Sequence, residues 1–113
     1  MTTPESKVKK AVVKILKDHG VYYFFPATHG YGRSGVPDII ACFCGQFIAI
    51  ECKADDGKLT ALQEREILRI RRAGGDAFLV NEELLDDLNQ YFYFAGLYCF
   101  PATQSCADDE HRD

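Results

Sequence analysis

Apolar positions along the chain recur first with a helical period and then with a strand period. Five apolar residues at the i, i+3, i+4, i+7, i+8 spacing predict a half-buried helix that runs to about Asp18: Val8, Ala11, Val12, Ile15 and Leu16. A Thr N-cap and Pro4 mark its start. Glu5 lies three residues before Val8, and we expect it on the buried side of this helix.

The next segments read as strands. β-Branched and aromatic residues over 21–25 predict a strand, and the glycine-rich stretch 27–35 predicts one long loop. Two apolar runs, 38–44 and 46–53, then predict a hairpin that turns at Cys44-Gly45. Both faces of this hairpin are largely apolar, so helices must cover each of them.

The hairpin register brings charged residues together at its open end. With a two-residue turn, Asp38 lies opposite Glu51, with Cβ atoms ~4.5–5.5 Å apart, and Lys53 points to the same side. Facing acids repel each other unless a cation lies between them, and oxygen ligands suit Mg²⁺ or Mn²⁺. A three-residue turn would place the acids on opposite faces. The acids also have a plainer interpretation as solvated strand-end charges neutralised by Lys53 and Arg33.

The remaining pattern completes an α-β-β-β-α-β-α order. Thr60-x-x-Gln63 is a capping-box pattern that begins a helix ending at Gly74, and Gln63 shares the stripe that faces the sheet. Residues 77–80 read as a short buried strand, and Asn81 caps a third helix. We expect a mixed sheet with helices on its faces, in one domain over 1–106 followed by an acidic, disordered tail over 107–113.

Charge is distributed unevenly along the 113 residues. The net charge is −4, yet residues 1–75 carry 12 Lys and Arg against 8 Asp and Glu, while residues 76–113 carry 1 against 9. Two helical stripes are basic: Lys7, Lys10, Lys14 and Lys17, and Arg65, Arg69 and Arg72. Such stripes could follow a phosphate backbone, although many only solvate a helix.

Five cysteines without metal-ligand spacing make a structural zinc site or a disulfide framework unexpected, and we interpret them as small core residues. No signal peptide and no apolar run long enough to span a bilayer is evident. The expected location is the cytoplasm, with no membrane partner.

Three motifs carry a family resemblance: Gly35-Val36-Pro37-Asp38, Glu51-Cys52-Lys53 and Leu59-Thr60-Ala61-Leu62-Gln63. Together they resemble the PD-(D/E)XK nuclease superfamily, and more narrowly the virus-type replication-repair nuclease (VRR-NUC) domain of stand-alone phage and bacterial proteins. The resemblance implies an α/β, αβββαβα restriction-endonuclease-like core. It also implies a Mg²⁺- or Mn²⁺-dependent endonuclease that acts on branched DNA, as Holliday-junction resolvases and flap or nicking nucleases do in DNA repair.

The resemblance also assigns roles to residues. It implies that Asp38 and Glu51 hold the metal together with the backbone carbonyl of Cys52, and that Glu5 serves a second metal or a bound water. Lys53 and Gln63 would complete the catalytic set. Contacts to DNA are expected from a basic and polar group: Lys7, Lys10, Lys14, Arg33, Ser34, Lys58, Arg65 and Arg69.

Two further hypotheses remain open. The negative net charge and small size also suit a nuclease-fold module that binds DNA or a protein without cutting. Six aromatic residues between Tyr91 and Phe100 exceed what one helix face buries, so we expect a homodimer through this region. Alternatively, this segment folds back over its own core.

Overall fold

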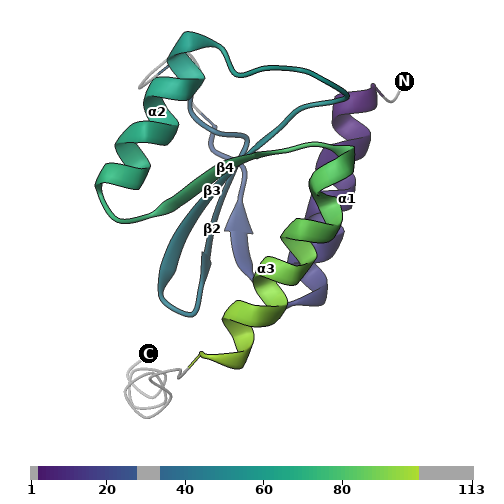
Figure 1. Ribbon diagram of the computed structural model, residues 1–113, viewed down its shortest axis with the longest axis vertical. Helices are drawn as coiled ribbons and strands as arrows, with labels where there is room; N and C mark the ends of the chain where they lie inside the picture. The colour runs from purple at the N-terminus through teal and green to yellow at the C-terminus, as the bar shows by residue number, and fades with distance from the viewer. Residues whose placement is uncertain (1–2, 28–33, 100–113) are drawn as a thin grey trace.

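The fold has the expected element order with one addition. The structure, a computed structural model, describes residues 3–27 and 34–99. Figure 1 shows the helices around a central sheet. The elements are α1 (Pro4–Asp18), β1 (Tyr22–Phe24), β2 (Ile39–Phe43), β3 (Gln46–Cys52), α2 (Ala61–Arg72), β4 (Asp76–Val80), the 3₁₀ turn η1 (Glu82–Leu84) and α3 (Leu85–Leu97).

The four strands form one mixed sheet in the order β1-β2-β3-β4. The pairs β1/β2 and β2/β3 are antiparallel, and β3/β4 is parallel because α2 provides the crossover between these two strands. The predicted α/β class with a mixed sheet is confirmed.

The hairpin has the register that a two-residue turn predicts. Ile39 pairs with Ile50 and Phe43 with Gln46, so the turn consists of Cys44 and Gly45. Both turn residues have positive φ, 54° and 80°, as a type I′ turn requires. The three-residue alternative is therefore excluded, and the register continues to Asp38 opposite Glu51.

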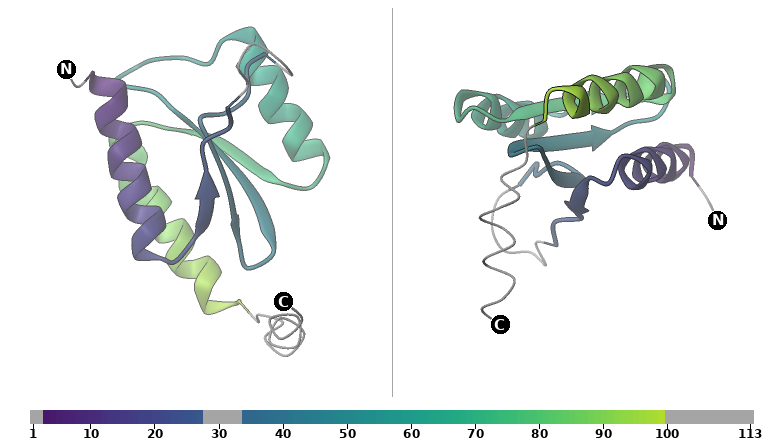
Figure 2. Two further views of the ribbon diagram at one scale, coloured as in Figure 1. Left: turned by 180° about the vertical axis from the view of Figure 1, so that it is seen from behind. Right: turned by 90° about the horizontal axis from the view of Figure 1, so that it is seen from below.

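Each face of the sheet has its own helical cover. Figures 1 and 2 show α1 and α3 side by side on one side of the strands and α2 on the other. Side chains along β2 and β3 point alternately to the two faces of the sheet, so each face has its own core. The larger core joins Ile39, Ile48 and Ile50 to helix residues that include Val12 and Phe92, and the smaller one joins Ala49 and Ala77 to Ile67 of α2.

The helix boundaries follow the expected signals, with one difference. Thr3 caps α1, and Thr60 begins α2 with both bonds of a capping box. Asn81 caps the short turn η1, accepting hydrogen bonds from the backbone N–H groups of Glu83 and Leu84, and α3 begins only after it.

A disulfide between Cys44 and Cys99 contradicts the interpretation of the cysteines as small core residues without a disulfide framework. The positive-φ turn at Cys44 places it next to the chain just beyond α3, with the two Cα atoms 5.4 Å apart. Cys42 is exposed and only Cys52 of the described cysteines is a buried core residue, while Cys106 lies outside the described range. In a reducing compartment the pair would be held as two thiols.

Replacing both bonded cysteines, Cys44→Ser with Cys99→Ser, should lower the free energy of unfolding by about 2–4 kcal/mol under non-reducing conditions. The bond closes a loop of 55 residues, so its loss returns conformational entropy to the unfolded chain. Urea unfolding of both proteins with and without dithiothreitol measures this. The difference should vanish with reductant, and Cys42→Ser should be neutral. Equal stabilities without reductant would contradict the bond.

The C-terminal aromatic segment is divided between core and surface. Tyr91 packs against the core and Phe92 is fully buried. Tyr93, Phe94, Leu97 and Tyr98 are each more than half exposed, whereas Phe100 lies outside the described residues. Within the described range, the alternative that this segment folds back over its own core therefore holds for Tyr91 and Phe92 and not for these four side chains.

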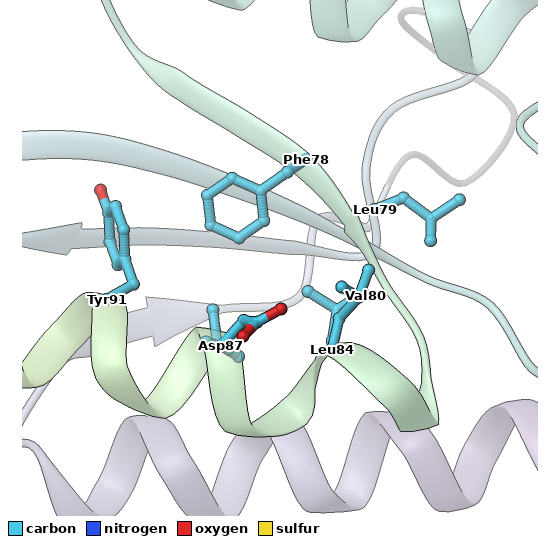
Figure 3. Close-up of a pocket in the computed structure, with 7 residues that line it drawn as sticks. Phe78, Leu79, Val80, Leu84, Asp87 and Tyr91 are labelled. Atoms are coloured by element: carbon cyan, nitrogen blue, oxygen red, sulfur yellow. The ribbon is translucent and has the colours of Figure 1, made fainter.

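A small apolar pocket of about 260 Å³ lies between β4 and α3 (Figure 3). Phe78 faces Tyr91 across it, and Val80 faces Leu84. The Tyr91 hydroxyl donates a hydrogen bond to Asp76, and burial followed by this contact raises the pKa of the phenol. The side chains that line the pocket are mostly apolar and form no cluster of charged groups.

No helix in the described ranges has the length and apolarity to cross a membrane.

Candidate functional site: two carboxylates at the open end of the hairpin

The candidate site lies where β2 begins and β3 ends. Asp38 directly precedes β2, and its Oδ2 accepts a hydrogen bond of 2.9 Å from the backbone N–H of Cys52, the last residue of β3. The backbone N–H of Lys53 donates to Val80 of β4, so the chain stays attached to the sheet beyond β3. Contacts among β2, β3 and β4 thus hold Asp38, Glu51 and Lys53 at one end of these strands.

Glu51 is the most unusual residue of this edge because it is 3% exposed although it is an acid. Burial and, after it, the negative charge of Asp38 raise the pKa of Glu51 to about 7, while the Lys53 ammonium acts in the opposite direction. Its Oε1 is buried without a hydrogen-bond partner among the described residues. Desolvating a carboxylate oxygen in this way is costly without a compensating partner.

Lys53 occupies the expected side of the hairpin. Its Nζ lies 3.7 Å from Glu51 Oε2, and its side chain is 15% exposed. The ammonium therefore meets the acids in a partly desolvated setting, where attraction is stronger than at the surface. It is the only cation that the structure brings into salt-bridge contact with Glu51 within the described residues.

Gln63 uses its one amide group for two purposes. Its Oε1 accepts from the Thr60 backbone N–H at 2.9 Å, which completes the capping box of α2. Its Nε2 donates to Glu51 Oε2 at 3.1 Å. The expectation that Gln63 faces the sheet is confirmed, and the side chain links the first turn of α2 to the buried carboxylate.

Gly35 permits the close approach of the segment before Asp38 to α2. It has φ of 79°, and a Cβ atom at this position would lie 2.5 Å from the carbonyl carbon of Leu62. Only glycine fits both the backbone conformation and the space. The Gly35 and Gln63 motifs, which are far apart in sequence, therefore meet at the first turn of α2.

Glu5 lies in the first turn of α1, but its side chain is exposed, so the expectation of a buried position is wrong. At 100° per residue, position 5 falls between the buried residues Val12 and Leu16, so its exposure comes from its place in the end turn of the helix. Its charge still acts on the site, as the smallest of the contributions that raise the pKa of Glu51.

Most of the expected DNA-contacting residues are exposed. They are Lys7, Lys10 and Lys14 of α1, Ser34, Lys58, and Arg65 and Arg69 of α2. Lys14 pairs with Asp18 at 2.9 Å, and Arg69 lies 3.8 Å from Glu66. Arg33 and most of the 27–35 loop lie outside the described residues.

Sequence reasoning did not single out three residues with unusual surroundings: Glu66, Lys9 and Phe25. Glu66 is a buried acid on α2, and its spacing of three residues from Gln63 and four from Ile70 was the signal that could have indicated this. Lys9 lies 4.9 Å from the centre of the Phe25 ring. The position of Phe25 just before Pro26, at the end of a short strand, is the only signal that could have indicated an exposed ring.

The donor set at the site consists of two carboxylates. Within residues 3–27 and 34–99 no group of three or more His, Cys, Asp or Glu side chains is arranged to hold a metal ion. The thiol of Cys52 is a poor ligand here because burial and the nearby acids raise its pKa to about 12. Any ion would depend on oxygen ligands, water and substrate.

Comparison with known proteins shows which family and which relatives the chain resembles. Residues 5–88 match the model of the family described as archaeal Holliday junction resolvase (Hjc). A putative nuclease, p44, of Acyrthosiphon pisum secondary endosymbiont phage 1 is 33% identical over 85 residues, which cover 74% of this chain and 88% of that protein.

Solved structures share the fold. A VRR_NUC domain superimposes with a TM-score of 0.69 and 26% identity, covering 81% of this chain and all of that one. The Hjc Holliday junction resolvase of Archaeoglobus fulgidus superimposes with a TM-score of 0.51 and 22% identity, over 68% of this chain and 65% of that one.

Proposed function

Because the chain belongs to the archaeal Holliday junction resolvase (Hjc) family, we propose that it is a divalent-metal-dependent endonuclease that cuts branched DNA. At the coarser level of the family it is a DNA nuclease. The observation that carries the finer proposal is the pair Asp38 and Glu51 at the open end of one hairpin, beside the Lys53 ammonium.

The oxygen donors at this site fit Mg²⁺ or Mn²⁺. Glu51 Oε1 is buried and unsatisfied among the described residues, and Asp38 adds a second negative charge. Mg²⁺ commonly uses one or two carboxylates and keeps several waters, so a pair of acids is sufficient. Asp38 and Glu51 would hold the ion, with the Cys52 carbonyl as a further oxygen ligand and Glu5 acting on a second ion or through a bound water.

When bound, such an ion polarises the scissile phosphate and lowers the pKa of a water molecule. Lys53 then has the role of placing a fixed positive charge where negative charge grows on the phosphate. Its low exposure strengthens this effect, because few waters screen the ammonium.

Gln63 has a positioning role in this proposal. Its amide holds Glu51 Oε2, which leaves Oε1 free for a ligand, and the capping bond to Thr60 fixes the amide in turn. An amide with both ends engaged is less available to bind water or phosphate directly. Gln63 therefore acts through Glu51.

A homodimer is the proposed assembly. Four adjacent side chains of the C-terminal segment, Tyr93, Phe94, Leu97 and Tyr98, are largely exposed, which is unusual for a cluster of large apolar residues. A two-fold dimer would present two sites to two strands of a junction. Light scattering at micromolar concentration tests this, and a 12.7 kDa particle would contradict it.

The activity is tested with single-stranded, duplex, flap and four-way-junction DNA in Mg²⁺ or Mn²⁺. We expect cleavage of the branched substrates and none in EDTA. Binding of DNA without cleavage in any of these ions, together with no Mn²⁺ binding by calorimetry, would instead favour the non-catalytic module. We propose that this activity takes place in the cytoplasm.

Lys53→Ala should slow cleavage about a hundred- to a thousandfold, the usual effect of removing one electrostatic donor to a transition state. The two carboxylates stay in place, so Mn²⁺ binding by calorimetry should persist in this variant. Single-turnover cleavage of a junction measures the rate. Undiminished cleavage by Lys53→Ala would remove this residue from the mechanism.

A further inference from the structure

A basic groove runs along α1 beside the end of β1. It is open to solvent and has a volume of about 580 Å³. Four lysines of α1 line it, Lys9, Lys10, Lys14 and Lys17, together with the ring of Phe25. Lys9 and Phe25 belong to none of the site groups described above.

The groove is strongly positive although the whole chain is negative. The single acid that lines the groove, Asp18, forms a salt bridge of 2.9 Å with Lys14. Asp18 therefore does not neutralise the other three lysines of the lining. This local excess contrasts with the net charge of −4. A polyanion is therefore the ligand that the lining favours.

Phe25 adds an exposed aromatic ring to the basic lining of the groove. Phe25 is 49% exposed, and its ring makes an edge contact with the Tyr23 ring, with the ring centres 5.9 Å apart. Lys9 Nζ lies 4.9 Å from the ring centre. An exposed aromatic ring among lysines is the combination with which proteins bind single-stranded nucleic acids, by stacking a base while cations contact the backbone.

The groove begins at the edge of the sheet that carries the candidate site. Phe24 pairs with Ile40 in the antiparallel β1/β2 pair. Phe25 therefore lies just beyond the end of β1, beside the start of β2, which Asp38 directly precedes. Figure 1 shows α1 running from this end of the sheet toward the opposite end, and the span from Ser6 to Lys17 is about 17 Å long. A strand leaving the carboxylates could therefore follow the lysines.

We propose that this groove binds a single-stranded arm of the DNA substrate, with Phe25 stacking on an unpaired base and Lys9, Lys10 and Lys17 contacting its phosphates. The inference rests on the proposed nuclease function and refines it, because it makes DNA with an unpaired arm the preferred substrate class. A fully paired duplex cannot offer a base to Phe25.

The test measures binding in EDTA, so that it does not depend on cleavage. Fluorescence anisotropy compares a blunt duplex with the same duplex carrying a single-stranded thymidine arm. Phe25→Ala should weaken binding of the armed duplex at least about fivefold, the lower limit for loss of one stacked base, and leave the blunt duplex unchanged. Phe25→Trp should restore the binding.

Phe24→Ala is the matched control, because Phe24 is a neighbouring phenylalanine with similar exposure, 46%, that does not line the groove. It should bind the armed duplex like the wild type. Lys17→Ala should reduce the slope of log K against log salt by about 0.7 for the single-stranded arm.

Three results would overturn the inference. They are an equal effect of Phe25→Ala on armed and blunt DNA, no effect on either, and binding to phosphatidylglycerol vesicles that depends on Phe25 while binding to the arm does not. These outcomes leave cleavage of junctions untouched. Conversely, a protein that cuts no DNA but shows the Phe25-dependent preference would refute the nuclease proposal and retain the groove as a DNA-binding site.

Discussion

Asp38→Asn should lose at least about a thousandfold in cleavage rate, equivalent to about 4 kcal/mol of transition-state stabilisation, while the protein remains folded. The substitution keeps an oxygen that can accept the 2.9 Å hydrogen bond from the Cys52 backbone N–H, so the hairpin end is preserved. It removes only the negative charge and one carboxylate oxygen. Single-turnover cleavage of a four-way junction, with circular dichroism of the same sample, measures both effects.

The matched control for this prediction is Asp86→Asn, the same chemical change at an exposed acid in the first turn of α3. It should cleave at the wild-type rate. Calorimetry adds a second readout, because Asp38→Asn should also bind Mn²⁺ much more weakly than Lys53→Ala does. Cleavage by Asp38→Asn at the wild-type rate would refute the site.

Glu51→Gln should abolish cleavage to a similar extent and yet make the metal-free protein more stable, by about 3 kcal/mol at pH 8. The folded state keeps the Glu51 proton up to a pKa of about 7, whereas the unfolded chain releases it near 4.5. Folding of the wild type therefore becomes less favourable as the pH rises from 4.5 to 7, and the loss remains at higher pH. Glutamine has no charge to bury, so the variant escapes this loss.

Urea unfolding in EDTA at pH 4 and pH 8 measures this difference, which should be small at pH 4. Glu83→Gln, at an exposed position of η1, is the control and should change stability by less than about 0.5 kcal/mol at either pH. Mn²⁺ should stabilise the wild type and not the Glu51→Gln variant, because only the wild type gains a ligand on folding. A variant less stable than the wild type at pH 8 would contradict the burial argument.

Local sequence was sufficient for the parts of the fold that short-range rules govern. Thr60 and Gln63 stand at the spacing of a capping box, and the structure contains both of its hydrogen bonds. A two-residue turn at Cys44-Gly45 places Asp38 opposite Glu51, and the structure selects this turn over the three-residue alternative that the sequence left open. Once the hairpin was set, the position of Lys53 followed from strand alternation.

Features that depend on contacts between distant elements could not be predicted in this way. The Cys44 and Cys99 pairing requires the hairpin turn and the end of α3 to meet, and no spacing in the sequence indicates this. The exposure of Glu5 depends on what packs against the first turn of α1, which the pattern of apolar residues does not give. The bond from Gln63 to Glu51 arises because α2 packs on the face that carries the acid.

The Gln63 amide links the first turn of α2 to the buried carboxylate of the hairpin, because it bonds to both Thr60 and Glu51. End turns are the parts of helices that open most readily in the native state. When the first turn of α2 opens, Glu51 loses a hydrogen-bond donor at the same moment that Thr60 loses its acceptor. Residues that never approach the carboxylates, such as Thr60, thereby govern how long Glu51 keeps one orientation.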